Sequence, residues 1–288
     1  LEKDGFKVEK LLLLQSGEIP SDTELLIIPG PEKPILPEEQ KLIEGYLSRG
    51  GSVLLLLDPQ SKAGMEDFLK QWGIDAPDSF VIDPMSKLFG GDYAAPVVSQ
   101  YVAHEITRGF ALPTIFPLLR TVSSIKSSDA NTTEFLLTGA NSWGETNLDI
   151  LKDGKSQFDE KSDIKGPVSV AVLSTREVPA EGVNEPQNNK KEPASDLKNI
   201  NAHLTVIGDS DFAGNQYFNF SGNGDLFLNI VSFLAEEENL ISIRPKERKN
   251  SPDSEAEGTI KNDKRVSKLI MGISLVSIRT HLINVSAV

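Results

Sequence analysis

The 288-residue sequence contains no cysteine, which excludes disulfide bonds, thiolate zinc sites and a cysteine nucleophile from this chain. Basic residues are few, because 29 lysines and arginines stand against 42 aspartates and glutamates, for a net charge of −13. An acidic protein repels phosphate backbones and anionic lipid headgroups. We therefore expect no nucleic-acid partner.

The usual signatures of catalysis and cofactor binding are also missing. The sequence has no GxSxG nucleophile elbow and no GxGxxG or GxxxxGK phosphate-binding loop. Its three histidines, His104, His203 and His281, lack the spacing of metal ligands. We therefore expect neither a cofactor nor a metal. The apolar run at residues 269–278 has ten residues, about half of the roughly 20 that a membrane-spanning helix needs.

What is present is typical of a folded protein. Hydrophobic residues make up 39% of the chain and there are 22 glycines, a globular composition at a length that predicts one large or two modest domains. Residues 1–243 carry 20 basic and 37 acidic side chains, whereas residues 244–288 carry 9 and 5. This change of sign predicts that the folded domain ends near residue 243 and that a basic, poorly ordered tail follows.

The clearest local pattern is a strand, a helix and a second strand near the start of the chain. Residues 24–30 and 52–57 are continuous apolar runs, as in strands that are buried on both faces. Between them, Pro37 begins a helical pattern that Gly50 and Gly51 end. Such a unit is a βαβ crossover, which implies parallel strands. Further strands of the buried type are predicted at residues 168–173 and 203–207.

These patterns together predict an α/β domain over residues 1–243, with a mostly parallel sheet and flanking helices. An irregular, β-rich insertion is predicted at about residues 84–166. The segment 177–199 is rich in Glu, Asn, Lys and Pro, which predicts a mobile loop. Because an apolar run begins almost at once, with no initiator Met and no signal peptide before it, we expect the chain to begin inside a domain.

Candidate site residues follow the ends of the predicted parallel strands. Asp209 and Asp211 come directly after residues 203–207, and Asp58 follows residues 52–57. Ligand sites in open α/β sheets lie at this edge, where carboxylates could hold a polar ligand or a hard cation. The interpretation that we favour is that Asp209 and Asp211 cap turns and helix starts. His104, in a predicted loop, is a further candidate for ligand binding.

Several short segments recur in the order and spacing of a known family. They cover nearly all of residues 5–246 and comprise 16–20 (SGEIP), 25–31 (LLIIPGP), 46–51 (YLSRGG), 54–59 (LLLLDP), 104–107 (HEIT), 142–143 (SW), 206–213 (VIGDSDFA), 223–234 and 241–246. Together they resemble the GldG-like family, auxiliary components of ABC-type transport systems linked to bacterial gliding motility. The HEIT segment departs from the family pattern, because Glu105 stands where the family has proline.

The resemblance implies a membrane-anchored protein that works with an ABC permease and ATPase. Its domain would lie on the periplasmic face of the bacterial inner membrane, attached through segments outside this sequence. The fold implied is similar to the class I glutamine amidotransferase-like or flavodoxin-like fold. Enzymes with the amidotransferase fold use a cysteine nucleophile that this chain lacks, so the resemblance implies a scaffold, and no catalytic residue is carried over.

Three functional hypotheses follow from the sequence. The first is a non-enzymatic extracytoplasmic auxiliary domain that binds a partner protein or a transported substrate. The second is a carboxylate-based hydrolase that uses Asp58, Asp209 and Asp211, which predicts that these side chains converge. The third is a ligand- or metal-sensing module built on residues 208–211.

Overall fold

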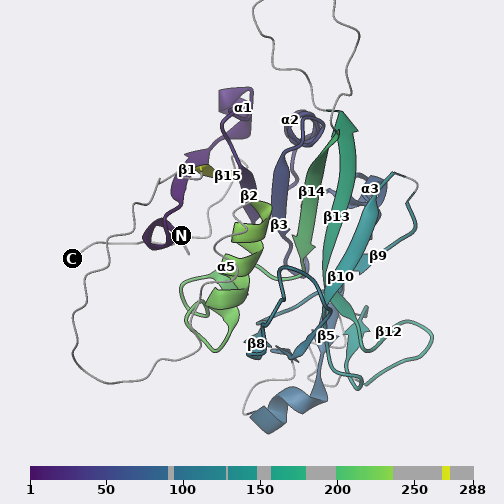
Figure 1. The fold of residues 1–288 in the computed structure, drawn as a ribbon. Helices are drawn as coiled ribbons and strands as arrows, with labels where there is room; N and C mark the ends of the chain where they lie inside the picture. The colour runs from purple at the N-terminus through teal and green to yellow at the C-terminus, as the bar shows by residue number, and fades with distance from the viewer. Residues whose placement is uncertain (90–93, 128, 148–156, 180–198, 236–267, 273–288) are drawn as a thin grey trace, which may run out of the picture.

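The computed structural model describes residues 1–89, 94–127, 129–147, 157–179, 199–235 and 268–272 (Figure 1). Within these ranges an eight-stranded sheet has the order β1-β15-β2-β3-β14-β13-β10-β7. Its strands are β1 (Lys7–Leu11), β15 (Lys268–Gly272), β2 (Leu25–Pro29), β3 (Ser52–Leu56), β14 (Asn199–Ile207), β13 (Ser169–Pro179), β10 (Asn131–Leu137) and β7 (Gln100–Tyr101).

Shorter elements surround this sheet. Three small antiparallel sheets pair β12 (Ile164–Lys165), β11 (Trp143–Glu145) and β5 (Phe80–Ile82); β4 (Ile74–Asp75) and β9 (Ser123–Ser124); and β6 (Val97–Val98) and β8 (Thr114–Ile115). The helices are α1 (Leu13–Ser16), α2 (Pro37–Leu47), α3 (Glu66–Gln71) and α5 (Asn223–Leu234), with 3₁₀ turns η1 (Glu2–Asp4), η2 (Pro84–Phe89) and η3 (Asp211–Ala213). None of the helices in the described part of the chain is long and apolar enough to cross a membrane.

The predicted fold class, a mostly parallel sheet with flanking helices similar to the amidotransferase-like or flavodoxin-like fold, is wrong. Among the described residues, seven of the eleven strand pairings are antiparallel and four are parallel. In the part of the chain that the structure describes, helices are few and mostly short. The protein is therefore built mainly of strands in mixed sheets.

The physical reason for this error lies in β13 and β14. They include most of the runs 168–173 (VSVAVL) and 203–207 (HLTVI), whose pattern predicts strands buried on both faces, as in a parallel sheet. In the structure they pair antiparallel, from Ala171 opposite Ile207 to Pro179 opposite Asn199. An apolar run predicts that a strand is buried on both faces, but it does not predict whether the neighbouring strands run parallel or antiparallel to it.

The βαβ unit itself is confirmed. β2 and β3 pair parallel with Leu25 opposite Ser52, and α2 connects them. Pro37 occupies the first turn of α2, where its missing N–H leaves no hydrogen bond unmade, and the Glu39 carboxylate accepts a hydrogen bond from the backbone N–H of Leu36 at 2.9 Å. The sequence therefore predicted this unit correctly, because the signals that define it are local.

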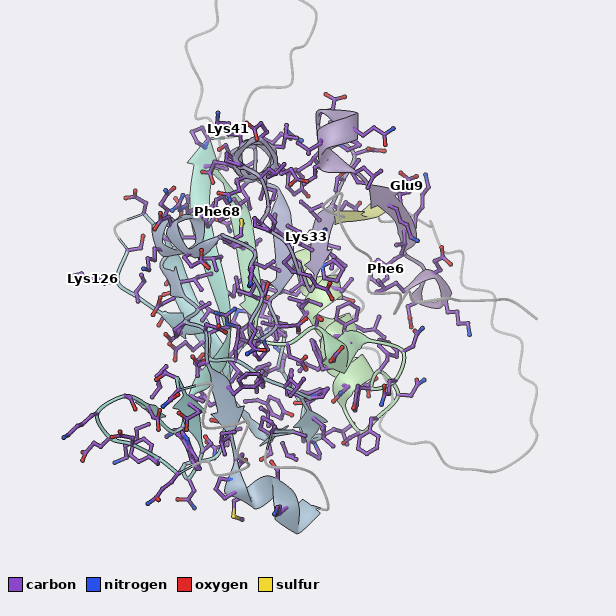
Figure 2. All side chains as sticks on the ribbon, turned by 180° about the vertical axis from the view of Figure 1, so that it is seen from behind. Phe6, Glu9, Lys33, Lys41, Phe68 and Lys126 are labelled. Carbon is purple, nitrogen blue, oxygen red and sulfur yellow. The ribbon has the colours of Figure 1, made fainter. Side chains whose placement is uncertain are left out.

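Apolar cores cover both faces of the large sheet. In β3, Leu54 and Leu56 contact the core under α5, whereas Val53 and Leu55 contact the core under α2 and α3. Figure 2 shows the molecule from behind, with Phe68 on α3. Because side chains of a strand alternate between faces, four consecutive apolar residues are what a strand between two helical layers needs.

Parts of the predicted domain division lie outside the described residues. The predicted boundary at residues 243 and 244 falls within 236–267, and most of the predicted loop 177–199 falls within 180–198. Within the predicted tail, residues 268–272 form β15, which pairs parallel with β1 and with β2. The division at residue 243 stays a prediction.

Candidate functional site

The parallel strands β2, β3 and β14 end side by side, and their ends position the candidate aspartates. The ladder continues past the strands, with hydrogen bonds from the Gly30 N–H to the Leu56 carbonyl at 2.9 Å and from the Leu57 N–H to the Ile207 carbonyl at 2.8 Å. Asp58 and Gly208 therefore follow adjacent strand ends. Asp58 and the residues after β14 therefore lie at the same edge of the sheet.

Asp58 binds the loop that follows β14. Its Oδ1 accepts a hydrogen bond from the Ser210 backbone N–H at 2.6 Å, and its Oδ2 accepts one from the Ser210 hydroxyl at 2.8 Å. Burial raises the pKa of Asp58, and these bonds from Ser210 partly oppose the rise. Gly30 packs directly against this pair, because a Cβ atom there would lie 2.7 Å from the Ser210 hydroxyl oxygen. Its φ of +54° also favours glycine at this position.

Asp209 is the most buried of the three carboxylates, with 1% of its surface exposed. One of its oxygens accepts a hydrogen bond from the Asp211 N–H at 2.9 Å and the other from the Phe212 N–H at 3.2 Å, where η3 begins. Burial raises the pKa of Asp209 well above the usual aspartate value, and the neighbouring Asp58 raises it further. Asp209 therefore acts as a cap for the turn after β14.

The structure brings three of the four predicted site residues together. Asp211 is exposed, and its negative charge raises the pKa of both Asp58 and Asp209. His104 lies elsewhere, with its ring 5.1 Å from that of Phe233 in the last turn of α5. The first turn of α5 contacts the loop after Asp209, through Asn223 and the Phe212 carbonyl at 3.3 Å. The length of α5 therefore places His104 roughly 15 Å from that contact.

His104 belongs to a small aromatic cluster. Its Nδ1 accepts a hydrogen bond from the Ile106 N–H at 3.2 Å, and burial lowers its pKa. The same Phe233 ring lies 5.7 Å from the ring of His203, whose Nδ1 is 3.1 Å from the Thr175 hydroxyl. Both histidines therefore pack within this part of the structure, in contacts that a structural role explains.

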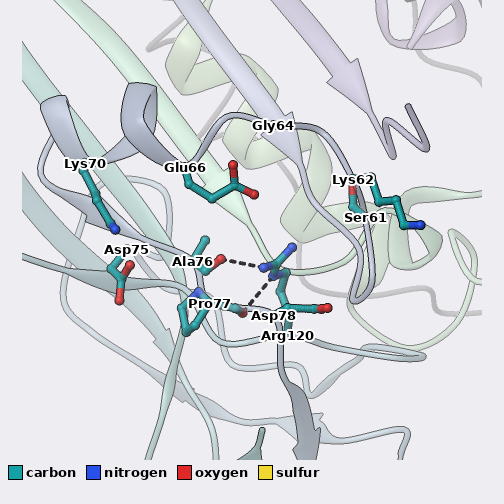
Figure 3. Close-up of a pocket in the computed structure, with 10 residues that line it drawn as sticks. All are labelled: Ser61, Lys62, Gly64, Glu66, Lys70, Asp75, Ala76, Pro77, Asp78 and Arg120. Carbon is teal, nitrogen blue, oxygen red and sulfur yellow. Dashed lines mark hydrogen bonds between the residues drawn. The ribbon is translucent and has the colours of Figure 1, made fainter. Parts of the chain in front are cut away.

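A cavity of about 580 Å³ opens beside the strand-end aspartates. It is formed by the loop after β3, by α3, by β4 with the residues after it, and by Arg120 (Figure 3). Its volume lies in the range of about 300–1,000 Å³ that is usual for small-molecule sites. The charged residues that line it are Lys62, Glu66, Lys70, Asp75, Asp78 and Arg120.

Arg120 connects this cavity to the strand ends. It is 3% exposed, and its backbone N–H donates to the Gly208 carbonyl at 2.9 Å. Its guanidinium donates to three backbone carbonyls, those of Ala76 at 2.5 Å, Pro77 at 3.2 Å and Asp58 at 3.2 Å. The sequence analysis missed this residue. The available signal was a lone arginine in the apolar stretch 115–122 (IFPLLRTV), which is unusual because buried cations are rare.

The geometry limits what the three aspartates can do chemically. All four oxygens of Asp58 and Asp209 accept hydrogen bonds from the loop after β14. No group of three or more His, Cys, Asp or Glu side chains among the described residues could hold a metal ion. Of the three candidate aspartates, Asp211 alone is exposed. The arrangement therefore fixes the loop after β14 more than it offers free oxygens to a ligand.

The buried carboxylate of Asp209 leads to a prediction about pH. Its pKa is raised in the folded protein, so its contribution to stability is greatest in acid and falls as the pH rises from the ordinary aspartate pKa toward the folded-state pKa. We expect the free energy of unfolding of Asp209→Asn, which cannot ionise, to depend less on pH than that of the unsubstituted chain. The slope that is removed is at most about 1.4 kcal/mol per pH unit.

Urea unfolding from about pH 5 to about pH 8 measures this difference. The control is Asp67→Asn on the exposed face of α3, which should keep the pH dependence of the unsubstituted chain. If Asp209→Asn and the unsubstituted chain gave parallel stability curves across this range, Asp209 would not be the buried titrating group that the structure indicates.

Comparisons with known proteins add the following findings. A family model described as an ABC-type uncharacterized transport system, auxiliary type, matches residues 1–230. A solved structure described as "mmIFT52 N-terminal domain" is similar over 77% of this chain and 87% of that chain, with 17% sequence identity and a TM-score of 0.47. No curated protein matches the chain.

Proposed function

Because the chain belongs to the auxiliary family of ABC-type transport systems, we propose that it is a non-enzymatic accessory domain that binds a partner protein or a transported substrate. The proposal that the domain is not an enzyme rests on the burial and hydrogen bonding of the carboxylates at the strand ends. A general acid or nucleophile must reach the substrate, whereas Asp209 is 1% exposed and both of its oxygens accept backbone hydrogen bonds.

The proposal includes the partners and the location that the family resemblance implies. The partners are the ABC permease and ATPase, and the domain lies on the periplasmic face of the inner membrane. The gliding-motility subtype rests on the resemblance of segments such as 25–31, which comprises β2 and the two residues after it, and 206–213, which comprises the end of β14 and the turn that follows. A chain without cysteine also has no thiol to oxidise in the periplasm.

The first experiment tests the partner. The chain is co-expressed with the permease and ATPase of an ABC transport system from its own genome, and an affinity tag on the permease is used for purification from detergent. We expect the chain to co-purify with the permease, and an unrelated ABC permease serves as the control. Equal recovery with both permeases, or recovery with neither, would contradict the proposed association.

A second experiment tests for catalysis. We expect no turnover of amide, ester or glycoside substrates by the purified chain. Asp211→Asn is the informative variant, because Asp211 is exposed and the substitution keeps the size of its side chain, so the fold should be kept. Turnover that fell sharply in Asp211→Asn would favour the carboxylate-based hydrolase instead.

The location has its own test. Protease added to intact spheroplasts should cleave the chain when it is produced from its full-length gene. A cytoplasmic protein in the same cells should stay intact until the membrane is broken. Protection of the chain in intact spheroplasts would overturn the proposed periplasmic location and would leave the association with the permease to be judged separately.

A further inference from the structure

The cavity beside the strand ends has an unusual balance of charge. Three of its lining side chains are basic and three are acidic, so the formal charges cancel. Figure 3 shows the carboxylate of Glu66 and the guanidinium of Arg120 facing the same space, and Lys70 and Asp75 belong to the same lining. Charges of both signs therefore border one cavity within the reach of a small molecule.

Arg120 lacks the partner that a buried cation usually has. It is 3% exposed, yet it makes no ion pair within 4.0 Å among the described residues. A guanidinium has five N–H donors, and three bonds to carbonyls leave two donors without a partner in the described part of the chain. Buried charges are normally paired, because an unpaired one costs free energy. A carboxylate placed in the cavity would supply this partner.

An anion alone does not fit the rest of the lining. The negative charges of Asp78, Glu66 and Asp75 attract the Arg120 guanidinium and oppose the lowering of its pKa by burial. The same charges would repel a simple anion. A ligand with a carboxylate and an ammonium group satisfies both signs. The ten residues that line the cavity include no aromatic side chain on which a sugar ring or a nucleobase could stack.

We propose that this cavity binds a small zwitterion, such as a free amino acid, with its carboxylate on the guanidinium of Arg120 and its ammonium group on the carboxylate of Glu66. The proposal goes beyond the accessory role, because the cavity would bind such a ligand whether or not the chain contacts a permease. Both contacts are charge-assisted hydrogen bonds, the kind that contributes most to the affinity of a polar site.

Isothermal titration calorimetry of the full chain with each common L-amino acid tests the proposal. For the amino acid that binds most tightly, two matched ligands each lack one charge: the N-acetyl derivative lacks the ammonium group, and the methyl ester lacks the carboxylate. We expect both derivatives to bind at least about tenfold more weakly than the parent. Absence of heat with every amino acid at millimolar concentration, or equal affinity for the N-acetyl derivative, would overturn the proposal.

Variants assign the two ends of the ligand. Glu66 is exposed on α3, so Glu66→Gln should fold normally. We expect this variant to bind the parent amino acid about tenfold more weakly, whereas its affinity for the N-acetyl derivative should hardly change. Asp67→Asn, one residue further and outside the cavity lining, should change neither affinity. If Glu66→Gln weakened both ligands equally, or neither, the ammonium group would not lie on Glu66.

Discussion

Replacing Gly208 with alanine is expected to lower the free energy of unfolding by about 3 kcal/mol. A Cβ atom at this position would overlap the backbone carbonyl oxygen of Arg120. Neither segment can move away easily, because the Gly208 carbonyl accepts from the Arg120 N–H at 2.9 Å and the Gly208 N–H donates to the Val170 carbonyl at 3.0 Å. The extra methyl group must therefore break backbone hydrogen bonds at the strand ends.

Chemical denaturation monitored by tryptophan fluorescence measures this loss. The matched control is Gly45→Ala in α2, where an added Cβ has no atom within 4 Å. Because alanine favours a helix over glycine, Gly45→Ala should stabilise the protein by about 1 kcal/mol. Equal effects of the two substitutions would show that the close packing of Gly208 against Arg120 does not exist in solution.

Replacing Arg120 with methionine is expected to destabilise the protein by about 2 kcal/mol. The methionine would fill similar space but would leave the carbonyls of Ala76, Pro77 and Asp58 without the guanidinium donors. The Asp58 carbonyl keeps the N–H of Ser61 at 3.2 Å, so the largest cost falls on the Ala76 carbonyl. The loop after β3 and the segment after β4 would lose their shared anchor.

Two further variants make this prediction specific. Arg120→Lys retains the positive charge with a single nitrogen, so it should lose part of the stability and fall between the unsubstituted chain and Arg120→Met. Arg108→Met removes an exposed arginine that pairs with Glu105 at 2.7 Å, and its effect should stay within about 0.5 kcal/mol. If Arg120→Met were no worse than Arg108→Met, Arg120 would not hold these segments together.

The sequence predicted the elements that depend on local signals. The strands predicted at residues 24–30 and 52–57 are β2 and β3, and the helix predicted between them is α2. These predictions use only the periodicity of apolar residues within one element. The direction of β13 relative to β14 depends on a connection at residues 180–198, for which the sequence shows no helical pattern, and the error in fold class began there.

The candidate site shows the same division between local and distant information. The position of Asp58, Asp209 and Asp211 at one edge could be predicted, because each follows an apolar run that ends in a turn. Arg120 could not, because it enters from the irregular segment before β9 and its carbonyl partners are 43, 44 and 62 residues away. Composition gives no sign of which distant carbonyls will surround a buried guanidinium.

The insertion of β15 between β1 and β2 has a consequence for synthesis on the ribosome. Among the described residues, β1 pairs with β15 alone, and the two strands lie more than 250 positions apart in the sequence. A nascent chain must therefore emerge as far as residue 272 before β1 can find this neighbour, while β2 and β3 can pair much earlier. Closing so long a loop is slow, so β1, although it is made before β2 and β3, should join the sheet after them.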